Sequence, residues 1–228
     1  MASGKRARRD NVVQLERNPI EFGFTDVKPL NFIQGEYLRA IQSNQIVFGV
    51  GSAGTGKTYV AATYAAGELF HRRIQKIILT RPNVETGRGL GFLPGTLEEK
   101  YAPYLEPFDN VFARSLGKGF YEYALKAKTI EPKPLGFMRG ATFDNCIVLL
   151  DEAQNATKEE MKMLLSRIGK NCKMIISGDV DQADIPDSGL SDAIHRLDHI
   201  PDIEVVRFMD DDIVRSKMCK QIILAYRD

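Results

Sequence analysis

The 228-residue sequence has no tryptophan and only three cysteines, Cys146, Cys172 and Cys219, with no C-x-x-C pair. Such spacing predicts neither a disulfide framework nor a cysteine-rich metal site, and buried, reduced thiols are the simpler interpretation. No apolar run approaches the length of a membrane span, and no apolar signal segment follows the basic N-terminus. A net charge of +1 means that any nucleic-acid binding must come from local patches. We therefore expect a cytoplasmic chain with no membrane partner.

The sequence does contain enough apolar residues for a sizeable core. It is 43% hydrophobic and 27% charged, which suits one globular domain of this length. Residues 1–29 are expected to form a separate arm that carries the basic residues Lys5, Arg6, Arg8 and Arg9. A solvated tail would explain these charges, and so would a contact with nucleic-acid phosphate or with a neighbouring subunit.

From residue 30 onward, apolar segments typical of strands alternate with helical segments. We expect strands at Ile46–Val50, Ile77–Thr80, Cys146–Leu150, Met174–Ser177 and Glu204–Phe208. We expect helices at Gln34–Gln42, Lys57–His71, Lys158–Ile168, Leu190–Leu197 and Ile213–Tyr226. This alternation predicts an α/β domain with a mostly parallel sheet and helices on both faces.

A segment at about residues 83–143 breaks this alternation with clustered glycines and prolines. We expect it to be a helical insertion, with helices at Thr96–Leu116, interrupted by proline, and at Phe120–Lys126. Its aromatic residues lie among basic ones, an arrangement that suits either a small core of the insertion or a stacking platform for single-stranded nucleic acid. The core interpretation is favoured for most of them, namely Tyr101, Tyr104, Phe108, Phe112, Phe120, Tyr121 and Tyr123.

The most specific feature is the stretch Gly51-Ser52-Ala53-Gly54-Thr55-Gly56-Lys57-Thr58, which matches the phosphate-binding loop G-x-x-x-x-G-K-[ST]. Its glycines allow the backbone amides to turn toward phosphate, and the helix that follows adds its positive end. We expect Lys57 to contact the β- and γ-phosphates and the Thr58 hydroxyl to bind Mg²⁺. The expected nucleotide-binding residues are Gln34, Gly51, Ser52, Ala53, Gly54, Thr55, Gly56, Lys57, Thr58 and Tyr59.

A second motif ends the apolar stretch Ile147–Leu150 with two acids, Asp151 and Glu152. A buried strand would deliver both to the carboxyl edge of the sheet, where ligands bind in such folds. We expect Asp151 to hold Mg²⁺, mostly through water, and Glu152 to orient or deprotonate the attacking water. Taken alone, the pattern would also fit acids at a helix N-terminus. The tandem acids favour hydrolysis and argue against a P-loop kinase.

Two glutamines complete the expected site. Gln182 follows the strand expected at Met174–Ser177, which should lie close to the strand that ends at Leu150. Its amide could bond the γ-phosphate or the attacking water, although a simple Gly-Asp turn is the alternative. The side-chain amide of Gln34 could read the adenine edge. The presence of a glutamine at this position is explained equally well if Gln34 is an ordinary surface residue of a helix.

Together these residues resemble the PhoH family of P-loop ATPases, whose core is similar to the first motor domain of superfamily-1 helicases. The resemblance covers about Gln34 to the C-terminus. It is carried by the phosphate-binding loop, Thr80–Pro82 with Leu90–Gly95, Phe137–Gly140 with Leu150–Asn155, and Gly178–Gln182 with Ser188–Leu190. The chain departs from the family at Arg88, Ala141 and Ser216, where an acid, an arginine and a histidine are common.

The resemblance implies a RecA-like P-loop NTPase fold, hydrolysis of ATP with Mg²⁺, and action on RNA or single-stranded DNA as a ring oligomer, with a hexamer favoured. A nucleotide-gated RNA-binding module without motor activity is the alternative. An oligomer is also expected because a single RecA-like domain leaves the γ-phosphate open on one side, which helicases close with an arginine from a second domain. The candidates for such an arginine from a neighbouring subunit are Arg215, which we prefer, and Arg167, Arg139 and Arg81. The expected catalytic residues are therefore Lys57, Asp151, Glu152, Gln182 and Arg215.

Overall fold

The computed structural model describes residues 23–82 and 97–225. Most of the expected arm at residues 1–29, and the family-like stretch Leu90–Gly95, lie outside these ranges. Within them, a six-stranded sheet forms the centre, with the order β3-β2-β4-β5-β1-β6 and parallel pairing throughout. The strands are β1 (Ile46–Gly51), β2 (Lys76–Thr80), β3 (Ile130–Pro132), β4 (Cys146–Leu150), β5 (Cys172–Gly178) and β6 (Ile203–Phe208).

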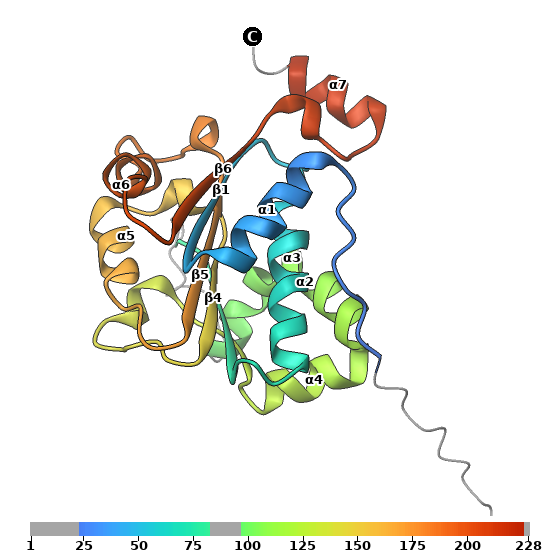
Figure 1. The fold of residues 1–228 in the computed structure, drawn as a ribbon, viewed down its shortest axis with the longest axis vertical. Coiled ribbons are helices and arrows are strands. Elements are labelled where there is room, and N and C mark those ends of the chain that lie inside the picture. The colour runs from blue at the N-terminus through green and yellow to red at the C-terminus, as the bar shows by residue number, and fades with distance from the viewer. Residues whose placement is uncertain (1–22, 83–96, 226–228) are drawn as a thin grey trace, which may run out of the picture.

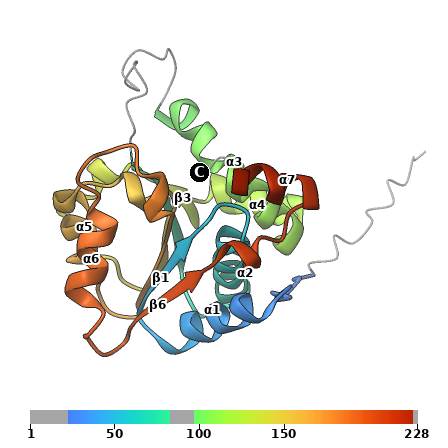
Figure 2. The same cartoon turned by 90° about the horizontal axis from the view of Figure 1, so that it is seen from above.

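Helices cover both faces of this sheet (Figure 1, Figure 2). One face carries α1 (Phe32–Ser43), α2 (Lys57–Phe70), α3 (Leu97–Leu116) and α4 (Lys118–Lys126), and the other carries α5 (Lys158–Leu165) and α6 (Gly189–Leu197). The last helix, α7 (Lys217–Ala225), follows β6 and lies beyond the end of the sheet. In the described part of the chain, no helix is long and apolar enough to cross a membrane. The expected α/β fold is confirmed.

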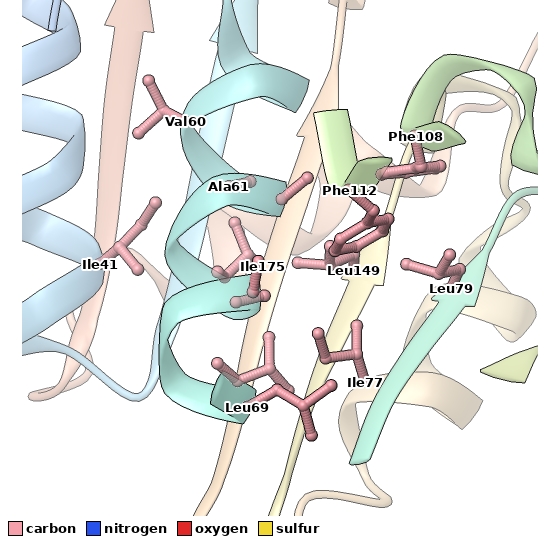
Figure 3. Close-up of a cluster of buried hydrophobic side chains, with 14 of the residues drawn as sticks. Ile41, Val60, Ala61, Leu69, Ile77, Leu79, Phe108, Phe112, Leu149 and Ile175 are labelled. Carbon is pink, nitrogen blue, oxygen red and sulfur yellow. The ribbon is translucent and has the colours of Figure 1, made fainter. Parts of the chain in front are cut away.

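Alternate residues of each strand enter different cores, because successive side chains point to opposite faces of a sheet. Figure 3 shows one face, where Ile77, Leu79, Leu149 and Ile175 of the strands meet Phe112 of α3. A second core lies on the opposite face, toward α5 and α6. Helix α2 contributes small buried side chains to the first core, which lets its backbone lie close to the strands; they are Ala61, Ala62, Ala65 and Ala66.

The structure corrects three expectations for the outer elements. Strand β3 was not expected and pairs with β2 at the edge of the sheet, where a proline such as Pro132 does not interrupt a ladder. Helix α3 runs without interruption through its prolines, because burial of Phe108 and Phe112 against the core offsets the lost backbone bonds. Helix α7 begins later than expected, since Val214 donates its backbone N–H to Gly54 O (3.0 Å) instead of joining a helix.

The register brings the functional segments to one edge. Val50 is level with Gly178, and Thr80 is level with Leu150, so β1, β2, β4 and β5 end near one another. The residues that follow these strands therefore converge at the carboxyl edge of the sheet.

Candidate nucleotide-binding site

A pocket of about 350 Å³ lies at this edge of the sheet. It is lined by the phosphate-binding loop, by residues that follow β2, β4 and β5, by α3 and by the segment before α7. Its residues are Ala53, Gly54, Gly56, Lys57, Thr58, Tyr59, Arg81, Pro107, Asp151, Glu152, Gly178, Asp179, Gln182 and Arg215. The structure thus brings ten of the residues expected from the sequence to one cavity. The remaining loop residues, Gly51, Ser52 and Thr55, are not among the lining residues.

Glycines give the phosphate-binding loop its backbone shape. Gly51, Gly54 and Gly56 have φ values of 133°, 82° and 89°, a region that other residues rarely adopt. A Cβ on Gly51 would lie 2.0 Å from Phe208 O, so β6 also excludes a side chain there. Gly56 precedes the first turn of α2, and no side chain of the described residues caps that turn. The first amides of α2 are therefore suited to bind an anion.

Lys57 extends its side chain back over the loop. Its Nζ donates to Gly51 O (2.5 Å), Ser52 O (2.8 Å) and Thr55 Oγ1 (3.2 Å). Burial lowers the pKa of Lys57, and the nearby carboxylates of Asp179 and Asp151 oppose this effect. A largely buried ammonium group held by neutral oxygens at the mouth of an anion-binding loop is suited to exchange those partners for phosphate oxygens.

Asp151 follows β4 directly and is 9% exposed. Burial raises its pKa to about 6, while the charge of Arg81 acts in the opposite direction. With the Thr58 hydroxyl in the same pocket, it offers the oxygen donors that Mg²⁺ prefers. Residues 23–82 and 97–225 contain no group of three or more histidine, cysteine or acidic residues placed to hold a metal. Thr58 and Asp151 supply two oxygen donors, which fits a magnesium ion that takes its other ligands from phosphate and water, as expected for a nucleotide complex.

Glu152 is held in place by two neighbours. Its backbone is left-handed, with a φ of 53°. Arg81 Nη2 lies 3.1 Å from one carboxylate oxygen, and Gln154 Nε2 donates to the other at 2.6 Å. Gln154 in turn accepts a bond from the backbone N–H of Asp179 (3.0 Å), so it joins the ends of β4 and β5. Gln154 was not among the expected site residues, although its place two residues after Glu152 was a usable signal.

The segment after β5 lies where the sequence predicted, because β5 pairs with both β1 and β4. Gln182 is exposed, lies in a 3₁₀ turn at Val180–Gln182, and lines the pocket. Asp179 was not among the expected site residues, although the stretch Gly178–Gln182 that contains it carries part of the family resemblance. It is 5% exposed, and its Oδ2 has no hydrogen-bond partner among the described residues. This buried carboxylate faces the same cavity as Lys57, which supports a site that binds a cation together with an anion.

The sequence predicted that Gln34 reads the adenine edge, whereas in the structure its side chain bonds other parts of the chain. Its side chain is fully buried and does not line the pocket. Its Nε2 donates to Thr55 O (2.9 Å), and its Oε1 accepts from the Leu30 backbone N–H (2.9 Å). These contacts make Gln34 a support for the phosphate-binding loop.

The candidate arginines lie in different places. Arg215 lies on the loop of its own chain, where a Cβ on Gly54 would come within 2.8 Å of its Nε. This placement favours a role in its own subunit over the trans role expected from the sequence. Arg81 also lines the pocket of its own chain, whereas Arg139 and Arg167 do not line it.

The aromatic residues of the insertion divide between core and surface. Phe108, Phe112 and Tyr121 are buried, as the core interpretation expected. Tyr123 on α4 is 66% exposed. The side chains of Tyr101 and Tyr104 lie outside the described residues. The stacking interpretation therefore rests on Tyr123 within the described part.

The parallel α/β sheet, with a phosphate-binding loop and an acidic pair meeting at its carboxyl edge, defines a P-loop NTPase. The particular family follows from comparison with known proteins. The family model described as PhoH-like protein matches residues 26–227, and the chain belongs to the PhoH family.

Curated relatives agree with this assignment. The chain is 44% identical over 209 residues to Protein PhoH of Escherichia coli (strain K12), a match that covers 88% of this chain and 59% of the relative. It is 47% identical over 196 residues to a PhoH-like protein of Bacillus subtilis (strain 168), covering 85% and 61%. The chain thus spans about three fifths of the length of these relatives. Among solved structures, the chain is similar to the S. cerevisiae Hsp104-ADP complex, at 17% identity and a TM-score of 0.36. The match covers 86% of this chain and 35% of that one. This likeness is remote, and no function follows from it.

Proposed function

We propose that this chain is an ATPase that binds ATP with Mg²⁺ and couples hydrolysis to the remodelling or unwinding of RNA or single-stranded DNA as a ring oligomer, with a hexamer favoured. The observation that carries the ATPase proposal is that Lys57 of the phosphate-binding loop and the acids Asp151 and Glu152 after β4, which are far apart in the sequence, line one pocket. A phosphate-binding loop alone would fit any nucleotide-binding protein, whereas an acid pair opposite the loop supplies groups for hydrolysis.

Each residue has a role that follows from its position. Lys57 and the first amides of α2 bind the phosphates and offset their charge. Thr58 and Asp151 would hold Mg²⁺, which when bound withdraws charge from the phosphate oxygens. Glu152 accepts a proton from the attacking water, and Gln182 orients that water or bonds the terminal phosphate.

Two substitutions test the ATPase proposal. Lys57→Ala is expected to abolish ATP turnover, because it removes the buried ammonium group that bonds Gly51 O and Ser52 O of the loop and would bind the phosphates. Glu152→Gln is expected to bind ATP and fail to hydrolyse it, since an amide does not accept the proton. Lys170→Ala, at an exposed position before β5, is the matched control and is expected to turn over ATP normally. Full turnover in Lys57→Ala would refute the site assignment.

The nucleic-acid and ring proposals need separate measurements. The exposed Tyr123 shares helix α4 with Lys118 and Lys126, and Lys126 follows it by three residues, a combination of aromatic and basic groups that suits a single strand. ATP turnover should rise on adding single-stranded RNA or DNA, and a strand-displacement assay should show unwinding. Stimulated turnover without displacement would instead favour the nucleotide-gated RNA-binding module. Native mass with and without ATP gives the oligomeric state, and a monomer in both conditions would refute the ring.

A further inference from the structure

We propose that Arg81 is a positioning residue that exchanges partners when substrate binds. It holds Glu152 in an ion pair until the terminal phosphate of a nucleoside triphosphate takes its guanidinium group, and this releases Glu152 to act on water. The inference rests on the proposed ATPase function and adds to it a link between substrate arrival and the freeing of the catalytic carboxylate.

The sheet fixes Arg81 beside Glu152. Strands β2 and β4 stay paired to their ends, with Thr80 level with Leu150. The backbone N–H of Asp151 then donates to Thr80 O (3.0 Å), which extends the ladder by one more bond. Arg81 and Glu152 therefore leave adjacent strands almost side by side, and the 3.1 Å contact between Nη2 and Oε1 follows from this register.

In this arrangement both carboxylate oxygens of Glu152 have partners. Arg81 takes Oε1, and Gln154, which is 2% exposed, donates to Oε2. The Gln154 side chain is itself bonded to the backbone of Asp179, so this second contact is anchored in the core. The contact with Arg81 is the more readily changed of the two, because the side chains of Arg81 and Glu152 are 23% and 45% exposed.

The same guanidinium group faces the place where phosphates are expected. Arg81 lines the pocket together with Lys57 and Thr58. A guanidinium group presents paired N–H donors that match phosphate oxygens, and a terminal phosphate carries more charge than one carboxylate. A nucleoside triphosphate therefore competes with Glu152 for Arg81, whereas a diphosphate lacks the group that would do so.

A cycle of binding measurements tests this exchange without turnover. The probes are ADP and a non-hydrolysable ATP analogue, each with Mg²⁺, titrated into the wild type, Arg81→Ala, Glu152→Gln and the double variant. Glu152→Gln should bind the analogue about 2- to 5-fold more tightly than the wild type, since a partly exposed ion pair no longer has to be broken. That gain should vanish when Arg81 is also alanine, and ADP affinity should change little in all four proteins.

Two further variants separate positioning from folding. Arg81→Lys keeps the charge without the paired donors and should recover part of the affinity for the analogue that Arg81→Ala loses. Arg73→Ala breaks a comparable surface pair with Glu68 (2.6 Å), away from the pocket, and should leave both affinities unchanged.

The proposal is overturned if Glu152→Gln gains affinity equally with and without Arg81, or if Arg81→Ala weakens ADP and the analogue alike. A failure of the proposed function looks different. The wild type would then bind nucleotide without turning it over, and the binding cycle would still report whether Arg81 exchanges its partner.

Discussion

Gln34→Ala distinguishes a support for the phosphate-binding loop from a group that reads adenine. The substitution leaves the buried carbonyl of Thr55 without this donor, which costs about 1–3 kcal/mol. Loss of the buried side-chain carbons adds about 1 kcal/mol. Leu30 is exposed, so water can replace the bond to its backbone N–H. We therefore expect the free energy of unfolding to fall by about 2–4 kcal/mol, which most domains survive because their total stability is about 5–15 kcal/mol.

Urea denaturation measures this loss, and Gln42→Ala, at an exposed position on the same helix, is the matched control with little expected effect. Binding of ATP and GTP should weaken by similar factors, because the loop that holds the phosphates is disturbed for both nucleotides. The reasoning is refuted if Gln34→Ala keeps the stability of the wild type and loses affinity for ATP alone.

Three further predictions concern the loop, the buried acid and the insertion. Gly51→Ala should lower the free energy of unfolding by at least about 2 kcal/mol, because of its φ of 133° and the Phe208 carbonyl. Gly35→Ala is the control: outside its own helix an added Cβ would meet nothing within 4 Å, so this variant should be neutral or slightly stabilising in a thermal melt. The free energy of unfolding of Asp151→Asn should be about 1–3 kcal/mol higher than that of the wild type. Urea denaturation of the nucleotide-free protein at about pH 8 measures this difference. Burial raises the folded-state pKa of Asp151 to about 6, above its ordinary value, so the wild type loses stability as pH rises from about 4 to about 6, and the difference should disappear near pH 4. Tyr123→Ala should weaken binding of single-stranded RNA with little change in stability, because its side chain is exposed. Phe112→Ala, at a buried position, should instead lower the free energy of unfolding by about 3–5 kcal/mol. Unchanged RNA affinity in Tyr123→Ala would exclude the stacking role.

The sequence was most informative where local pattern and burial coincide. Strand β4 has the bounds that its apolar run predicted, because all five of its residues are buried and two acids end the run. Strand β3 was missed because three residues at a sheet edge carry too little pattern, and its pairing with β2 depends on distant sequence. The partners of Gln34 were likewise hidden, since a buried amide is recognisable only once Thr55 and Leu30 are seen around it. The contact between Arg81 and Glu152 arises from the β2–β4 register, which no local motif encodes.

Strand β1, which leads into the phosphate-binding loop, lies between β5 and β6. Both of these neighbours follow β4 in the sequence, and β6 (Ile203–Phe208) is the last strand of the described residues. During synthesis, β1 therefore emerges from the ribosome well before either partner, with its backbone groups unpaired on both sides. The loop gains its wall at Phe208 only after β6 has been made. Competence to hold a nucleotide therefore depends on a strand that is translated long after the loop itself.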